Sequence, residues 1–104
     1  MPDATDPNLA RLLEDGRALR NAWRPEPALS VNQATLRMVR FEGHFSQFHT
    51  HDVDECYVVL EGELLVEIEG EPARRIARGE AYVVRAGTRH RPFAVPIAIV
   101  LLIT

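Results

Sequence analysis

The stretch GHFSQFHTHDVDECYVVLEG, residues 43–62, constrains the fold and the function more than any other part of the sequence. His49 and His51 are separated by one residue, so on an extended strand their imidazoles project from the same side. Glu55 follows four residues later and shares one face of the next apolar segment with Tyr57. Two imidazoles and a carboxylate that converge from neighbouring strands form a natural site for a divalent metal ion.

Two further histidines lie outside this pair. His90 belongs to a distant predicted strand and is the candidate fourth ligand. His44 has no partner at a ligand spacing and is equally well explained as an isolated surface side chain. We therefore treat only His90 as part of the predicted metal site.

Alternation along the strands also suggests which residues surround the metal. Gln47 shares the face of the histidine pair and Pro92 shares the face of His90, so both are expected in the wall of a pocket. Tyr57 is the candidate catalytic residue, as a proton donor to a bound ligand. The alternative for Tyr57 is a core tyrosine whose hydroxyl is satisfied within the protein.

The rest of the chain after residue 27 is predicted to be β. Gly43 is expected to end the first strand, residues 61–63 to form a tight turn, and Pro96 to separate the last two strands. Many short strands with glycine turns and no second helix indicate a sandwich or barrel. The predicted strands cover residues 36–41, 56–60, 64–69, 74–78, 81–85, 90–94 and 97–103.

Leucines at near-helical spacing predict one amphipathic helix over residues 8–21, weakened by Gly16. Asp6 is its expected cap and Pro7 its first residue. The prolines within residues 24–27 end it. The chain is thus expected to comprise an N-terminal tail and helix, residues 1–27, and a β-barrel domain, residues 28–104.

Composition limits the classes of function. A chain of 104 residues forms one domain. The net charge is −3 and no basic patch is present, so nucleic acid is not expected as a partner. The longest apolar run, residues 97–103, is much shorter than the roughly 18 residues of a membrane span. The single cysteine cannot form an internal disulfide, and the N-terminus lacks the pattern of a secretory signal, so a cytoplasmic location is expected.

The string Gly43-x5-His49-x-His51-x3-Glu55-x6-Gly62 resembles the first conserved motif of the cupin superfamily, without a gap. The resemblance extends over about residues 35–103. In this region the chain resembles small single-domain cupins. It implies an all-β, cupin-type double-stranded β-helix, or jelly-roll barrel, with one short N-terminal helix. It also implies one divalent metal ion, such as iron, manganese, nickel or zinc, bound inside the barrel by the two motif histidines, Glu55 and His90.

A second cupin motif is matched less completely. Gly79, Gly87 and His90 follow its spacing, but Arg85 replaces the motif proline and Ala94 replaces the motif asparagine. Arg85 is expected to line the mouth of the barrel, to pair with an acid or to point to solvent. Ala94 leaves the wall without an amide group. Neither departure removes a metal ligand.

Three functions fit this site. The first is a metal-dependent enzyme of dioxygenase or isomerase type that acts on a small organic acid, aromatic compound or sugar, because free coordination positions can bind a substrate. The second is a non-catalytic module that binds or senses a small molecule. The third is a metal-bearing dimer without a ligand. Fold alone does not select among them.

The last predicted strand, residues 97–103, is apolar on both faces, so its outer face requires cover from the N-terminal helix or from a second copy of the chain. We expect a homodimer with a two-fold, largely apolar interface of at least about 1,000 Å². The apolar residues available for this cover are Leu9, Leu13, Trp23, Phe41 and Phe45.

Overall fold

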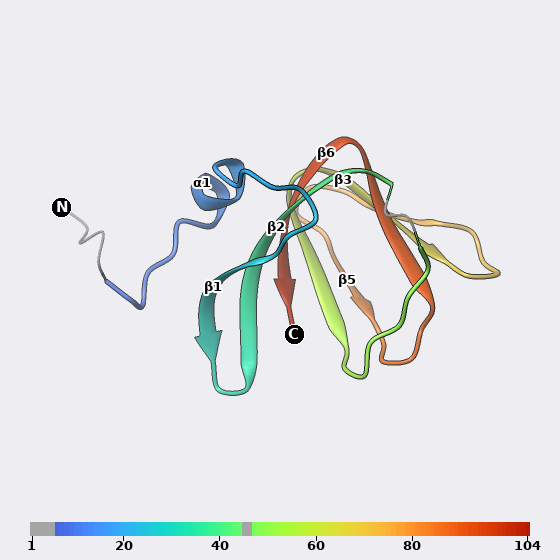
Figure 1. Cartoon of the computed structure of the whole chain (residues 1–104), viewed down its shortest axis with the longest axis horizontal. Helices are drawn as coiled ribbons and strands as arrows, with labels where there is room; N and C mark the ends of the chain where they lie inside the picture. The colour runs from blue at the N-terminus through green and yellow to red at the C-terminus, as the bar shows by residue number, and fades with distance from the viewer. Residues whose placement is uncertain (1–5, 45–46) are drawn as a thin grey trace.

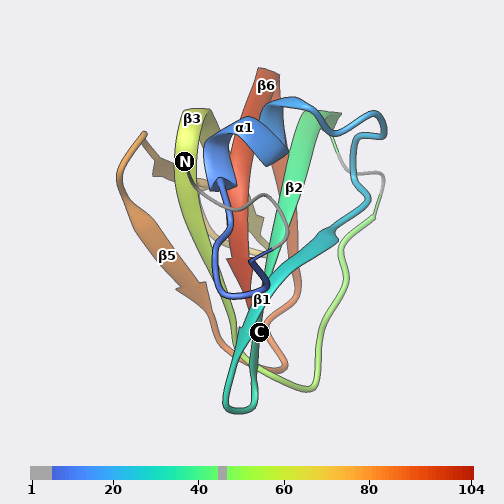
Figure 2. The same cartoon turned by 90° about the vertical axis from the view of Figure 1, so that its left-hand side faces the viewer.

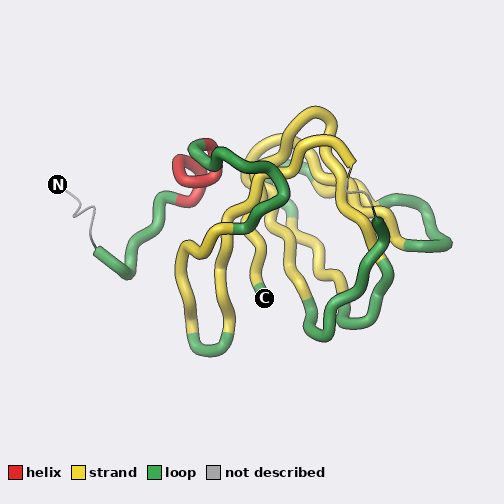
Figure 3. The backbone as a smooth tube through the Cα atoms, in the orientation of Figure 1, coloured by secondary structure: helices red, strands yellow, loops and turns green. Residues whose placement is uncertain are grey.

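The computed structural model describes residues 6–44 and 47–104. Within these ranges the chain forms one short helix and six strands, joined by turns and one longer loop (Figures 1 and 3). None of the described helical structure is long and apolar enough to cross a membrane. The elements in chain order are α1 (Leu12–Arg17), β1 (Glu26–Val31), β2 (Ala34–His44), β3 (Glu55–Ile68), β4 (Arg74–Ile76), β5 (Ala81–Val84) and β6 (His90–Ile103).

All the described strand pairs are antiparallel, and the strands follow the order β1-β2-β6-β3-β4, with β5 paired to β3. The last strand, β6, therefore lies between β2 and β3. The sheet curls into a barrel whose strands surround an apolar interior (Figure 1). The predicted all-β jelly-roll barrel with one short N-terminal helix is confirmed.

A bulge in β3 changes which residues face the interior. Tyr57 and Val59 belong to the buried interior cluster, and so do Leu64 and Val66, although the parity of the numbering has changed. The pairing of β3 with β6 shifts between Val59 and Glu61, and one extra residue in a strand reverses its two faces. The predicted tight turn at residues 61–63 is therefore wrong, because the strand continues through a bulge.

Two other predicted breaks are also continuous strand. β6 runs through Pro96, and its pairing with β2 and with β3 skips Val95 and Pro96, so the proline disturbs no ladder hydrogen bond. β2 likewise continues past Gly43 to His44, with a register shift between Glu42 and Gly43. The prediction that Gly43 and Pro96 end strands is therefore wrong, because at both residues the strand continues through a shift in register.

The helix is shorter than the predicted residues 8–21. The Asp6 carboxylate accepts a hydrogen bond from the backbone N–H of Asn8 at 2.9 Å, which forms a turn ahead of the helix. Asp6 and Pro7 therefore do not begin α1. Its N-cap is Arg11, which makes no side-chain capping hydrogen bond.

α1 crosses the outer face of the sheet over β2, β6 and β3 (Figure 2). Gly16 allows this close approach, since a Cβ atom at that position would lie 2.4 Å from Cγ2 of Ile99. The helix thus supplies cover for the outer face of the last strand. The outer cluster comprises buried Met38, Ile99 and Leu101, packed against Leu12, Leu13, Leu19, Ala28, Leu36, Val58, Leu60 and Ile103.

Two of the aromatic residues expected on the outer face pack inside instead. Trp23 and Phe41 contact each other with ring centroids 4.9 Å apart, and both belong to the interior cluster. Phe41 faces inward because it alternates with Met38 and Arg40, which face α1. Phe45 lies outside the described residues.

The first strand, β1, was not predicted. Pro27 within it and Pro25 before it make the segment resemble a linker. β1 is an edge strand that pairs only with β2 in the described sheet, and an edge strand tolerates proline. β1 begins at Glu26, just ahead of residue 28, where the barrel domain is predicted to begin.

Candidate metal centre

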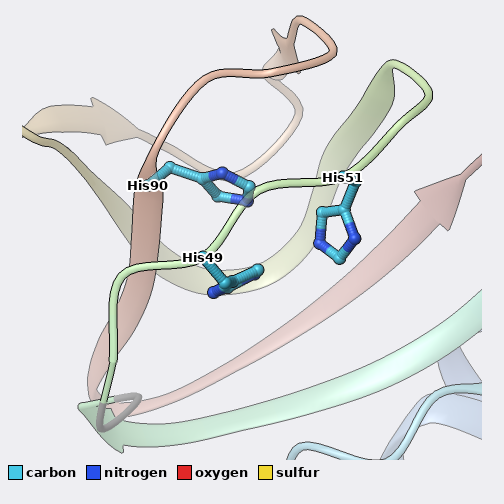
Figure 4. A group of neighbouring side chains, drawn as sticks. All are labelled: His49, His51 and His90. Atoms are coloured by element: carbon cyan, nitrogen blue, oxygen red, sulfur yellow. The ribbon is translucent and has the colours of Figure 1, made fainter.

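Three of the four histidines lie together. His90 is the first residue of β6, whereas His49 and His51 belong to the loop that leads into β3. The backbone N–H groups of His49 and His90 each donate to the other residue's carbonyl oxygen at 3.0 Å, which fixes the loop against the strand. One ring nitrogen from each of the three residues lies within 4.8 Å of the others, and the rings face a common space (Figure 4).

Backbone carbonyls orient two of these rings. Nδ1 of His90 lies 2.9 Å from the Thr88 carbonyl oxygen, and Nδ1 of His49 lies 3.3 Å from that of Gln47. A carbonyl oxygen only accepts hydrogen bonds, so each Nδ1 carries a proton, and in the neutral form of each ring the lone pair is on Nε2. This is the arrangement that orients metal-binding histidines through their second nitrogen.

Glu55 lies beside the histidines. Its Oε1 is 3.4 Å from Nε2 of His51 and 3.4 Å from Nε2 of His90, and the residue is buried. Burial alone would raise the pKa of Glu55, but the hydrogen bond with His90, the charge of His51 and the hydrogen bond from Tyr57 together lower it. The carboxylate is therefore ionised at neutral pH.

Tyr57 closes the inner side of the group. Its hydroxyl donates to Oε1 of Glu55 at 3.2 Å and lies 3.4 Å from Nε2 of His90. Burial, followed by the charge of Glu55 and the hydrogen bond to it, raises the pKa of Tyr57 above its ordinary value. The hydroxyl is thus a neutral donor at neutral pH, and it is satisfied within the protein while it borders the candidate site.

The two oriented histidines differ electrostatically. Burial lowers the pKa of His49, and the nearby imidazoles of His90 and His51 act in the same direction. Burial also opposes the charged form of His90, but the hydrogen bonds to Glu55 and to the Thr88 carbonyl outweigh it and raise its pKa. Neutral imidazole is the form that binds a metal ion.

The remaining sequence-predicted residues are placed as follows. Pro92 is buried on the interior face of β6, two residues beyond His90. Gln47 is exposed, and its backbone carbonyl contacts His49. His44 stacks on Phe93, with ring centroids 4.3 Å apart, and does not belong to the histidine group.

Arg85 pairs with an acid, one of its three expected roles. Its Nη1 lies 3.1 Å from Oδ2 of Asp54, and the Ala86 backbone N–H donates to Oδ1 of Asp54 at 2.8 Å. The Ala86 N–H and then Arg85 lower the pKa of Asp54. Asp54 precedes Glu55, so this contact anchors the start of β3. The other departure, Ala94, is fully buried in the interior cluster.

Sequence reasoning missed the supporting residues Asp54 and Thr88. Asp54 acts through partners more than thirty positions away, and no local pattern reveals such a pair. Thr88 contributes a carbonyl oxygen, which every residue type carries. Each oriented histidine lies two residues after the residue whose carbonyl it contacts. This spacing has a meaning only when the backbone conformation is known, so the sequence alone does not reveal the contact.

Comparisons with known proteins agree with this geometry. The Cupin_2 family profile, described as the cupin domain, matches residues 37–102. A crystal structure of a cupin-2 domain containing protein from Shewanella frigidimarina is similar, with a TM-score of 0.86 and 26% identity over 93% of this chain and 94% of that chain. Protein NMB1881 from Neisseria meningitidis has a TM-score of 0.83 and 25% identity over 91% and 96% of the two chains.

Among curated proteins, the uncharacterized protein YdbB from Bacillus subtilis strain 168 is 33% identical over 61 residues. The match covers 59% of this chain, and the chain spans about half the length of that relative, 54%. The matched profile covers more than half of the chain and includes His49, His51, Glu55 and His90. The chain therefore belongs to the cupin domain family.

Proposed function

We propose that this protein is a metal-dependent enzyme that acts on a small organic molecule, with one divalent ion held by His49, His51, Glu55 and His90. The observation that carries the proposal is the convergence of three histidine nitrogens within 4.8 Å. The carbonyl contacts at Nδ1, which orient two of these rings, support it.

The donor set fits a divalent cation. With bonds of about 2.1 Å, neighbouring donors around one ion lie about 3.0–3.5 Å apart and opposite donors about 4.2 Å apart. The distances of 3.4 Å from Glu55 to His51 and to His90 match neighbouring donors. A carboxylate with neutral imidazoles suits iron, manganese, nickel and zinc alike.

A bound ion of this kind supplies Lewis acidity or, if it is redox-active, electron transfer. The protein's own groups define the surroundings. Glu55 contributes a negative charge, and Tyr57 holds that carboxylate through its hydroxyl without ionising. The His51 side chain is 40% exposed, so a small molecule reaches the group from its side. Dioxygenase and isomerase chemistry are the reactions we propose.

Metal analysis of freshly purified protein tests the proposal. We expect about one ion per chain in the wild type and loss of most of it in the double variant His49→Ala/His51→Ala. His44→Ala is the matched control, because it removes an imidazole that stacks on Phe93 outside the group. Full metal retention by the double variant contradicts the assignment.

Turnover separates the enzyme from a non-catalytic binding or sensor cupin. Protein loaded anaerobically with Fe²⁺ is mixed with catechol-like or diketone compounds, and oxygen uptake is followed. Sustained uptake that the double variant lacks supports a dioxygenase. Binding of a compound without uptake or isomerisation favours the binding module.

A further inference from the structure

Arg37 faces the interior of the barrel. Its neighbour Met38 belongs to the outer cluster under α1, and Arg40 donates from Nη1 to the Leu19 carbonyl at 2.6 Å, also on the outer side. Successive strand residues alternate between faces, so Arg37 shares the inner face with Val39. Its partner on β6, Leu102, is likewise an interior residue.

No carboxylate of the described residues forms an ion pair with the guanidinium of Arg37. Among residues 6–44 and 47–104, most arginines form ion pairs with carboxylates, but Arg20, Arg37 and Arg78 do not. Arg20 and Arg78 are exposed, whereas Arg37 is half-buried. Within the described residues its Nη1 donates a hydrogen bond to Oγ1 of Thr104 at 2.9 Å, although a guanidinium has five N–H donors.

This guanidinium lies on the same inner surface as the candidate metal centre. Arg37 pairs with Leu102 of β6, and Leu102 pairs with Tyr57 of β3, so the three form one row across the sheet. Two strand spacings, about 10 Å, therefore separate the backbones at Arg37 and Tyr57. The Tyr57 hydroxyl contacts both Glu55 and His90.

We propose that Arg37 is a specificity-determining residue that binds a carboxylate of the ligand. The ligand class is a small organic acid with two anionic ends, one directed to the metal centre and the other to Arg37. The planar guanidinium matches a carboxylate with two parallel hydrogen bonds and supplies the missing opposite charge. This inference rests on the proposed function and narrows its substrate classes to acids, sugar acids included.

The same row suggests the length of a suitable probe. Arg37 and Tyr57, whose hydroxyl borders the metal centre, both face the interior from backbones about 10 Å apart, so we choose a chain of about five carbons as the probe. If Arg37 only stabilised the fold through its hydrogen bond to Thr104, the affinity of the protein would not depend on the group at the distal end of the ligand.

Two matched probes test the proposal. 2-Oxoglutarate and 2-oxopentanoate have the same five-carbon chain and the same metal-chelating 2-oxo acid, and differ in the distal carboxylate. Each is titrated calorimetrically into Ni²⁺-loaded wild type, Arg37→Gln and Arg20→Gln. Arg20→Gln is the control, because Arg20 also lacks a carboxylate partner but is exposed.

We expect the wild type to bind 2-oxoglutarate at least about tenfold more tightly than 2-oxopentanoate, the scale of a charge-assisted hydrogen bond. Arg37→Gln should abolish this preference and leave 2-oxopentanoate binding unchanged, while Arg20→Gln changes neither. Equal binding of the two acids by the wild type, or equal weakening of both by Arg37→Gln, overturns the proposal.

If Arg37→Gln does not fold, Arg37→Lys replaces it. Lysine cannot donate two parallel hydrogen bonds as a guanidinium does, so this variant should reduce the preference for 2-oxoglutarate. An undiminished preference overturns the bidentate contact.

Metal content measured on the same samples keeps the two proposals separate. About one ion per chain with no preference between the acids overturns the role of Arg37 and leaves the proposed function standing. Absence of metal overturns the proposed function, and the titrations are then repeated with metal-free protein. A preference for 2-oxoglutarate that depends on Arg37 still supports the carboxylate site there, and its absence overturns it.

Discussion

At the scale of single residues, the orientation of His49 and His90 depends on backbone atoms. Each Nδ1 faces the carbonyl oxygen of the residue two positions earlier, Gln47 or Thr88. The side chains of those two residues make no part of this contact. A metal-binding histidine is usually oriented by a carboxylate side chain or by a backbone carbonyl. Substitution removes a side chain but leaves a backbone carbonyl in place.

We therefore predict that Thr88→Ala and Gln47→Ala keep the metal affinity of the wild type within about threefold, although loss of an orienting side chain commonly costs about 10–100-fold. Competition with a chromogenic chelator measures the affinity. Tenfold weaker binding in either variant would show that the side chain, not the carbonyl, orients the ring.

The residues of the candidate site could be predicted because they obey local spacing. His49, His51 and Glu55 lie within one short segment, so their spacing is visible in the sequence, although the two histidines belong to the loop before β3 and not to a strand as expected. The partners of Asp54 and the interior position of Arg37 could not be predicted, because both depend on the pairing of distant strands. Strand register is a property of the folded sheet.

At the scale of the elements, Gly62 lies just beyond the bulge in β3, where β3 packs closely against β6. Its φ is +79°, and a Cβ atom there would lie 2.2 Å from the Ile97 carbonyl oxygen of β6. A backbone oxygen within a paired strand cannot move aside easily. Gly70 has a similar φ of +82°, but a Cβ atom there would meet nothing within 4 Å.

Gly62→Ala should therefore destabilise the protein by more than Gly70→Ala. We expect about 1–2 kcal/mol for Gly70→Ala, from backbone strain alone, and at least about 1 kcal/mol more for Gly62→Ala, from overpacking. Urea unfolding followed by circular dichroism gives both free energies. Equal losses would mean that β3 and β6 move apart to accept a methyl group at Gly62.

An exposed ion pair links α1 to β3. Nε of Arg17 donates to Oε2 of Glu61 at 2.9 Å, and this hydrogen bond, with the charge of Arg17, lowers the pKa of Glu61. A carboxyl whose pKa is lowered by folding stabilises the protein above its unfolded pKa of about 4.3, and this contribution disappears as the pH falls through the lowered value.

The urea midpoints of wild type and Glu61→Gln should thus differ slightly at pH 7, with the wild type more stable, and converge at acid pH, once the pH is below the lowered pKa of Glu61. Glu69→Gln, which removes a carboxylate paired with Arg89 away from α1, is the comparison. A difference between wild type and Glu61→Gln that persists unchanged at low pH would assign the effect to packing instead of charge.

Element boundaries were predicted less well than element type. Alternating apolar residues identified most of the strands, but Gly62 with its flanking glutamates has the composition of a turn as well as that of a bulge. Pro96 similarly marks a skipped pairing within β6 and not an end. The helix was predicted too long, because leucines that contact the outer cluster, such as Leu19, continue beyond the helical residues.

At the scale of the whole molecule, the homodimer stays a prediction. α1 covers the buried outer cluster, so the remaining apolar surface is smaller than residues 97–103 alone suggest. Leu9, Val95 and Ile97 stay exposed, with Val95 and Ile97 on the same bend of β6. Val100, by contrast, faces the interior and cannot contribute to an interface.

Light scattering at micromolar concentration should give twice the mass of one chain. Ile97→Asp should halve it without loss of circular dichroism, because a charge at an apolar interface is costly. Val31→Asp, at an exposed position of the β1 strand, is the control and should leave the mass unchanged. A wild type with the mass of one chain contradicts the dimer.

The central position of β6 delays the folding of the barrel until the end of the chain has been synthesised. A ribosome synthesises β2 and β3 well before their shared neighbour, so the growing chain carries two unpaired strand edges over an open apolar interior. The same strand begins with His90, whose backbone pairs with His49. Barrel closure and assembly of the histidine group are consequently a single late event, and a nascent chain interrupted before residue 90 has neither, which makes it a substrate for chaperones and proteases.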